Sequence, residues 1–171
     1  MVIITPILIA VNLLVFLLTQ DDYELRIRYG LNTLFESQDY YWQPFTSMFM
    51  HADWSHLLMN MAVLFQFGIL LERELDAKGR YLFIYFVGGL ITSMLSYLYI
   101  INFDIDVNLV GASGALSVLF GWFAFKDLDL RSGLIVTMLL VTFIPLMMGM
   151  NIAWYAHLIG FGIGWLSGYF I

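Results

Sequence analysis

Long runs of apolar side chains recur along most of this chain, and they restrict its fold more than any other feature. Runs long enough to cross about 30 Å of hydrocarbon lie near 2–19, 48–71, 81–101, 132–149 and 151–171, with a shorter run at 113–126. The mean hydropathy of +0.85 and the charged fraction of 12%, against about 25% in soluble proteins, agree with this reading. The pattern predicts an all-α integral membrane protein with six transmembrane helices, in a single domain over residues 1–171.

The composition excludes several classes of function. Cysteine is absent, which rules out disulfides, thiolate metal sites and a cysteine nucleophile. The formal net charge is −6 and the acidic residues fall in the expected loops, so nucleic acid is not an expected partner. Residues 2–19 lack a basic start and a small-residue cleavage site, which favours a transmembrane helix over a signal peptide. We expect the lipid bilayer as solvent, with neither a cofactor nor a metal ion.

The basic residues predict the orientation of the helices in the membrane. Five lie in the loops after the second and fourth runs and two in the first loop, near 20–47: Arg73, Lys78, Arg80, Lys126 and Arg131 against Arg26 and Arg28. Because basic loops stay in the cytoplasm, both termini are expected there, in the plasma membrane of a bacterial or archaeal cell. The first loop and the loop 102–112 then face outward. The first loop mixes charged and aromatic residues and is expected to be long, partly helical and amphipathic.

The fourth run is too short to cross the bilayer alone. About fourteen residues at 1.5 Å each give roughly 21 Å, and Lys126, Asp127 and Asp129 anchor its cytoplasmic end. Ser113, at the other end, is therefore expected roughly 10 Å below the outer surface. The loop 102–112 must descend to meet this sunken helix, which is tolerated only around a water-filled cavity inside the protein.

Two histidines are expected at the depth of Ser113. His157 lies six residues beyond Asn151, roughly 9 Å down, and His56 lies six to eight residues into its helix, roughly 9–12 Å down. Polar groups at membrane depth are costly and mark either a function or a hydrogen bond inside the bundle. A hydroxyl and an imidazole at one level suit attack on a carbonyl, with Ser113 as nucleophile and His157 as general base. No carboxylate is expected at this level, so the prediction is a dyad.

Small residues predict close contact between the helices that carry Ser113 and His157. They follow each of these residues in steps of three or four: Ser117 and Gly121 on one helix, Gly160 and Gly164 on the other. Small faces of this kind let two backbones approach closely. Gly111 and Gly114 flank the serine and leave its backbone open to a substrate.

Donors for a developing oxyanion are predicted from two helices. His56 and Asn60 are four residues apart and share one helix face, so both can point at the same negative charge. The helix that begins at Ser113 adds free backbone N–H groups and a positive dipole. Each feature alone has a plainer explanation, since serine and glycine also serve packing, and histidine and asparagine also bridge helices. Their coincidence at one depth favours catalysis.

In order and spacing, these residues resemble those of the rhomboid family of intramembrane serine proteases across nearly the whole chain. The matching segments are Met50-His51-Ala52-Asp53-Trp54-Ser55-His56-Leu57-Leu58-Met59-Asn60, Glu72-Arg73, Gly111-Ala112-Ser113-Gly114, and Ala156-His157-Leu158-Ile159-Gly160 followed by Gly164. The resemblance implies a six-helix rhomboid bundle, a dyad of Ser113 and His157, and an oxyanion site from His56, Asn60 and the Ser113 amide. It implies cleavage of transmembrane segments in single-span or multi-span membrane proteins. It also implies that the first loop plugs the outer leaflet and that the helix near 132–149 moves to admit substrate.

The chain departs from the family pattern at three places. Trp42-Gln43 stands where many members have Trp-Arg, and the glycine usual soon after Glu72-Arg73 is delayed to Gly79. Ser117 stands where some bacterial members have a tyrosine beneath the histidine. None of these departures touches the dyad.

Several alternatives fit the sequence less well. A catalytically silent rhomboid-like protein, serving in binding or quality control, would be marked by loss of the serine or histidine, and both are present. A transporter or channel would usually carry more ionisable residues within its spans. The sequence has neither a His-Glu-x-x-His zinc motif nor a pair of aspartates within the spans. His51 and His56, five apart on one expected helix, would point about 140° apart, which argues against a shared metal ion.

Overall fold

The fold is all-helical over residues 2–75, 78–150 and 152–171, which are the residues that the computed structural model describes. Within these ranges no strand is present, and a single antiparallel bridge joins Leu31 and Leu109. Three of the described helices are long and apolar enough to cross a membrane: Trp54–Glu74, Lys78–Asn102 and Leu128–Met147. Ile4–Thr19 is apolar but shorter. The expected start of the last run, Asn151, lies outside the described residues, and six crossings stay a prediction.

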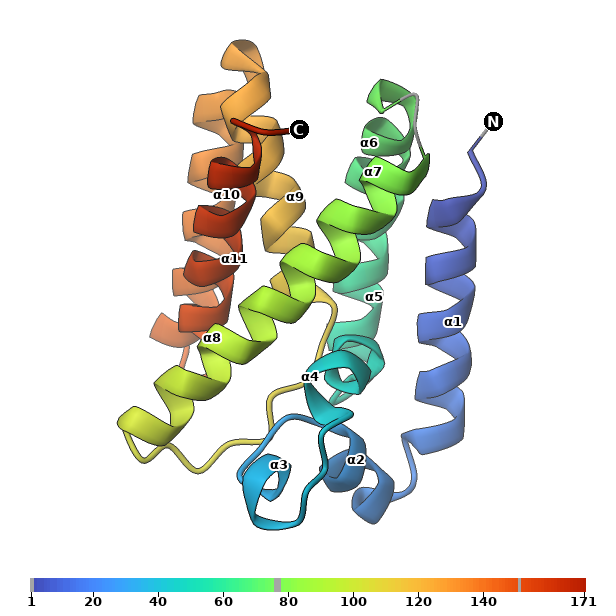
Figure 1. The fold of residues 1–171 in the computed structure, drawn as a ribbon, viewed down its shortest axis with the longest axis vertical. Coiled ribbons are helices and arrows are strands. Elements are labelled where there is room, and N and C mark those ends of the chain that lie inside the picture. Colours follow the sequence, from blue (N-terminus) through green and yellow to red (C-terminus); the bar gives the residue numbers. More distant parts are fainter. Residues whose placement is uncertain (1, 76–77, 151) are drawn as a thin grey trace.

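The centre of the bundle is α9 (Ser113–Lys126), whose residues from Ala115 to Ala124 are all buried. A helix that is apolar on every side is expected in such a position. Around it lie α10 (Leu128–Met147), α11 (Trp154–Ser167) and two long helices, each built of three consecutive pieces. The first long helix consists of α5 (Trp54–Val63), η2 (Leu64–Gly68) and α6 (Ile69–Glu74). The second consists of α7 (Lys78–Leu82), η3 (Phe83–Val87) and α8 (Gly88–Asn102). The pieces η2 and η3 are π-helical turns. Helix α1 (Ile4–Thr19) stands outermost, against α5 and η2 (Figure 1).

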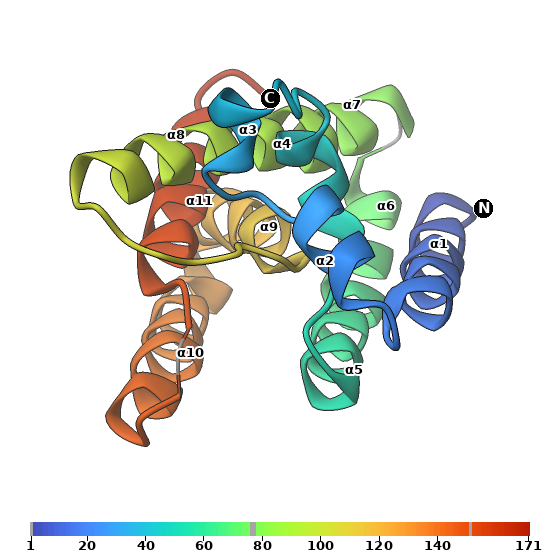
Figure 2. The ribbon, with the colours of Figure 1, turned by 90° about the horizontal axis from the view of Figure 1, so that it is seen from below.

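The segment between α8 and α9 brings the chain into the middle of the bundle. It runs along the lower end of the molecule and then rises, so that α9 begins near mid-height (Figure 1). The end at which α1 begins and α11 ends lies opposite this loop. Seen from below, α5 and α10 stand apart on the same side of the bundle (Figure 2).

The helix expected near 48–71 begins later than the sequence predicted. Ser47–Phe49 form a 3₁₀ turn, η1, and α5 starts only at Trp54. The N-cap is Asp53, whose Oδ1 accepts a hydrogen bond from the His56 amide at 2.8 Å. An aspartate here satisfies an N–H group that has no partner within the helix, and so it fixes where α5 begins.

The carboxylate of Glu72 joins α6 to the start of α1. It accepts hydrogen bonds from the backbone N–H groups of Ile3, Ile4 and Thr5, and from the Thr5 hydroxyl at 3.0 Å. Thr5 Oγ1 also lies 3.2 Å from the Tyr81 hydroxyl of α7. A carboxylate at this place satisfies the first amides of α1 and faces the positive end of its dipole. A polar contact therefore fastens α1 to the rest of the bundle.

The first loop holds three short helices: α2 (Tyr23–Tyr29), α3 (Leu34–Ser37) and α4 (Gln43–Thr46). Gln43, one of the departures from the rhomboid pattern, is fully buried. Its Oε1 accepts a hydrogen bond from the backbone N–H of Asn32, and its Nε2 donates one to the Ile27 carbonyl, both at 3.2 Å. Asn32 Nδ2 in turn donates to Asn108 Oδ1 at 2.7 Å. Amide side chains thus hold the first loop together and tie it to the loop before α9.

Candidate active site

Ser113 is the first residue of α9, and it is half-buried. Along the described chain no side chain caps this helix, and the first amide bonded to the preceding turn is that of Leu116, to the Ala112 carbonyl at 3.0 Å. The amides of Ser113 and Gly114 therefore have no partner within the helix. They carry the positive end of the dipole of α9, a setting that favours a developing negative charge.

Gly111 holds Ser113 and His56 close together. Its φ of +123° is a conformation that residues with a side chain rarely adopt. A Cβ built on Gly111 would lie 2.7 Å from His56 Nε2 and 3.6 Å from Ser113 Oγ. A side chain at position 111 would therefore collide with the His56 ring, and the imidazole and the Ser113 hydroxyl both lie close to the same point.

His56 lies less deep in its helix than the sequence predicted. It is the third residue of α5, in the first turn, rather than six to eight residues in, because Asp53 caps the helix. Bonds from the Ser55 hydroxyl and the His56 amide hold the pKa of the Asp53 carboxyl below its usual value. One turn on, Asn60 is buried and its Nδ2 donates to the His56 carbonyl at 2.9 Å. The amide has two N–H donors, so one remains for another acceptor.

His51 is buried and lies before α5, not on it. Its ring meets the ring of His56 edge-on, with centroids 5.1 Å apart, and its Nδ1 is 3.2 Å from the Phe49 carbonyl oxygen. The argument that these histidines point about 140° apart on one helix is therefore wrong. Among the described residues, no group of three or more His, Asp or Glu is placed to hold a metal ion.

Helices α9 and α11 are in backbone contact along the small residues that the sequence singled out. A Cβ on Gly160 would lie 2.5 Å from the Gly114 carbonyl oxygen and 2.9 Å from Ser117 Cβ. A Cβ on Gly164 would overlap the Val118 carbonyl, and one on Gly121 would lie 2.8 Å from the Trp165 amide nitrogen. The predicted packing of these two glycine-lined faces is confirmed.

His157 lies one turn before Gly160, beyond the last of these contacts. It is the fourth residue of α11, which begins at Trp154 and therefore later than the sequence predicted. In the described structure His157 and Ser113 are not hydrogen-bonded to each other. The contact between α9 and α11 places their helices side by side, and catalytic hydrogen bonds are often long before substrate binds.

The structure gives His157 a polar partner that the sequence analysis missed. Thr142 Oγ1, on α10, lies 3.2 Å from His157 Nδ1. The sequence feature that could have indicated this contact is a hydroxyl within a largely apolar helix, at a depth close to that of the histidine. Depth alone could not show which face of α10 meets α11.

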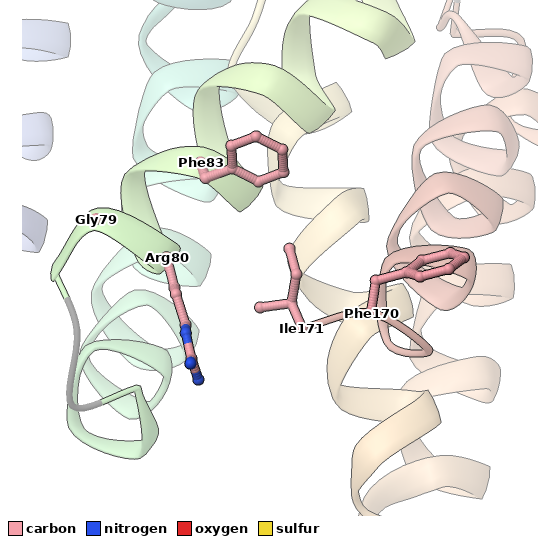
Figure 3. A pocket seen from close by; sticks show the side chains of 5 residues that line it. All are labelled: Gly79, Arg80, Phe83, Phe170 and Ile171. Carbon is pink, nitrogen blue, oxygen red and sulfur yellow. The ribbon is translucent and has the colours of Figure 1, made fainter.

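A pocket of about 400 Å³ lies away from these residues, at the end of the bundle where α7 begins. Gly79, Arg80 and Phe83 form one wall, and Phe170 and Ile171 form the other (Figure 3). None of the predicted catalytic residues lines it. We therefore assign the candidate site from Ser113 and its neighbours rather than from this pocket.

Comparison with known proteins places the chain in a family. The profile described as "Rhomboid domain" matches residues 38–171. "Rhomboid protease GlpG" of Haemophilus influenzae is 29% identical over 97% of this chain and 89% of its own length. "Putative rhomboid protease YdcA" of Bacillus subtilis is 33% identical over 75% of this chain and 66% of its own length. "RHOMBOID-like protein 4" of Arabidopsis thaliana is 32% identical over 75% of this chain, but this chain spans only 33% of that protein. With its apolar helices it is a membrane-embedded protein, and it belongs to the rhomboid family of intramembrane proteases.

Proposed function

We propose that this protein is a serine endopeptidase that cleaves transmembrane segments of single-span or multi-span membrane proteins, with Ser113 as nucleophile and His157 as general base. One observation carries the proposal: Ser113 begins a buried, uncapped helix that packs backbone to backbone against the helix of His157. A serine there has a chemical use that packing does not require.

The reaction would follow the usual course of acyl transfer. Ser113 Oγ forms a bond to the scissile carbonyl carbon while its proton passes to His157. The tetrahedral intermediate then collapses, the C–N bond breaks and His157 returns the proton to the leaving amine. Water then attacks the acyl-enzyme and gives a proton to His157, the C–O bond to Ser113 breaks to release the carboxylic acid product, and His157 returns the proton to Ser113 Oγ. No step in this sequence needs a cofactor or a metal ion.

The negative charge of the intermediate would be stabilised by donors close to Gly111. His56 Nε2 and Ser113 Oγ both lie within 4 Å of the point where a Cβ of Gly111 would stand, and the backbone amide of Ser113, which has no partner within the helix, would be the second donor. The second N–H of Asn60 is available one turn along α5. Such donors are fixed before substrate arrives, so they cost little reorganisation during the reaction.

The remaining topology belongs to the same proposal. The chain would cross the plasma membrane six times, with α9 as its short sunken helix and both termini in the cytoplasm. Substrate would enter beside α10, the membrane-length helix with the smallest buried share, 17% against 33% and 50% in the other two. A helix with little buried surface can move at lower cost than one buried along its length.

The test of the proposed function is cleavage by the purified protein in proteoliposomes. The wild type is expected to cut a single-span substrate within its transmembrane segment, as read by mass spectrometry of the fragments. A fluorophosphonate probe is expected to label Ser113 and to stop cleavage in proportion to labelling. Absence of both cleavage and labelling in folded protein would favour the catalytically silent alternative.

The oxyanion assignment predicts slower chemistry without loss of the nucleophile. His56→Ala and Asn60→Ala are each expected to lower the cleavage rate constant roughly 10²–10³-fold, the usual effect of removing one such donor. Fluorophosphonate access to Ser113 should persist. If both variants cleave at the wild-type rate, these side chains do not stabilise the oxyanion.

A further inference from the structure

The buried residues of helix α10 form one narrow stripe, and the end of that stripe nearest His157 is polar. Its buried residues are Leu134, Met138 and Thr142, spaced four apart, among twenty residues that are otherwise exposed or half-buried. Thr142 has no exposed surface. Its hydroxyl lies 3.2 Å from His157 Nδ1, so a fully buried polar side chain of α10 contacts the proposed base.

The bond of Thr142 differs from those of three other buried hydroxyls in helices, and it resembles that of Thr5, whose hydroxyl also reaches side chains of other helices. Thr19, Thr92 and Ser117 each donate to the carbonyl four residues earlier in the same helix, at 2.7–2.8 Å. That local bond is the usual way for a hydroxyl in an apolar helix to be satisfied. The bond recorded for Thr142 instead crosses to another helix and ends on an imidazole nitrogen.

We propose that Thr142 is a positioning residue that holds His157 in the tautomer and orientation required of the base. This inference rests on the proposed function. When Nδ1–H donates to Thr142 Oγ1, the lone pair is on Nε2, the nitrogen left to accept the proton of Ser113. With the opposite tautomer Nε2 carries a proton and cannot act as a base. The same Nδ1–H bond persists when the ring becomes an imidazolium, so the ring stays fixed throughout proton transfer.

Within the described part of the chain, the His157 ring has no hydrogen bond other than the one with Thr142. Ser117, one turn after Ser113, offers no aromatic surface, and its hydroxyl is engaged by the Ser113 carbonyl at 2.7 Å. Thr142 therefore takes the position that the third residue of a catalytic triad would have, next to the nitrogen of the base that does not accept the serine proton. Because Thr142 belongs to α10, the orientation of the base depends on the position of the helix beside which substrate is proposed to enter.

The experiment compares Thr142→Val with Thr142→Ser in proteoliposomes. Valine keeps the shape of threonine but removes the hydroxyl, whereas serine keeps the hydroxyl. Thr137→Val is the matched control, because Thr137 is an exposed threonine on the same helix. The measured quantities are kcat and KM for a single-span substrate, the rate of fluorophosphonate labelling of Ser113, and the thermal unfolding temperature. Ser113→Ala is run alongside to test the proposed function independently.

Thr142→Val is expected to lower kcat and the labelling rate together by roughly threefold to tenfold, the value of one hydrogen bond, with KM unchanged. Thr142→Ser should recover most of both rates, and Thr137→Val should match the wild type. Wild-type kcat and labelling in Thr142→Val would overturn the inference, as would a loss that serine does not recover. Should Thr142→Val not fold, Thr142→Ala removes the same hydroxyl with a smaller side chain. Cleavage by Ser113→Ala at the wild-type rate would instead refute the proposed function.

Discussion

Replacing Ser113 or His157 with alanine is expected to reduce cleavage of a membrane substrate at least roughly 10⁴-fold, because nucleophile and base act as one unit. Either change replaces a half-buried polar side chain with a smaller one and creates no steric clash. The fold should therefore survive, with little change in the thermal unfolding temperature. Initial rates in proteoliposomes, normalised to folded protein, measure the effect.

The matched control for the nucleophile is Ser132→Ala, an exposed serine on α10. This variant should cleave like the wild type. For the base, His157→Ala should also lose fluorophosphonate labelling of Ser113, since the probe reacts with an activated hydroxyl. Persistent labelling at the wild-type rate in His157→Ala would show that another group activates Ser113.

The second large effect is expected from Gly164→Ala, which adds one methyl group between α9 and α11. The new Cβ would overlap the Val118 carbonyl and lie 2.9 Å from the Trp122 amide nitrogen. Both are backbone atoms, which cannot rotate away, so the helices must separate. We expect a loss of stability of about 3 kcal/mol, at the upper end of overpacking costs. The cleavage rate per folded molecule should also fall, because the same separation moves His157 away from Ser113.

Gly162→Ala is the matched control on the same helix. A Cβ at Gly162 would meet nothing within 4 Å. Alanine there should leave cleavage unchanged and raise stability by up to about 1 kcal/mol, through its better helix propensity. Thermal unfolding in detergent and initial rates decide between the two variants. Equal behaviour of Gly162→Ala and Gly164→Ala would mean that the close approach of α9 and α11 is not what holds the site.

The sequence predicted the contact of α9 with α11, because glycines at helical spacing in an apolar run have few other uses. It misplaced the start of α5, because hydropathy does not distinguish an apolar helix from an apolar turn such as Ser47–Phe49. The sequence feature that marks the true start is Asp53, a residue typical of N-caps, directly before Trp54. Local capping chemistry, rather than apolar length, decides where this helix begins.

Other features could not be derived from the sequence because they depend on how distant segments meet. Gln43 gave no pattern of its own, yet its amide joins parts of the first loop that are 11 to 16 residues apart. Thr142 likewise finds His157 only after α10 and α11 are side by side. The rhomboid family itself could be identified from the motifs around Ser113 and His157, and it is confirmed by the match over residues 38–171.

The contact between Glu72 and α1 also has a consequence for biosynthesis. The amides that Glu72 satisfies lie 67 to 69 residues earlier in the chain. At 5–20 residues per second, α1 would leave the ribosome roughly 3–14 seconds before its carboxylate partner exists. During that interval the first amides of α1 depend on water or lipid headgroups for hydrogen bonds. We therefore expect the N-terminal end of α1 to stay at the membrane surface until α5 and α6 have been inserted. Helix α1 would then reach its final position later than its place in the sequence suggests.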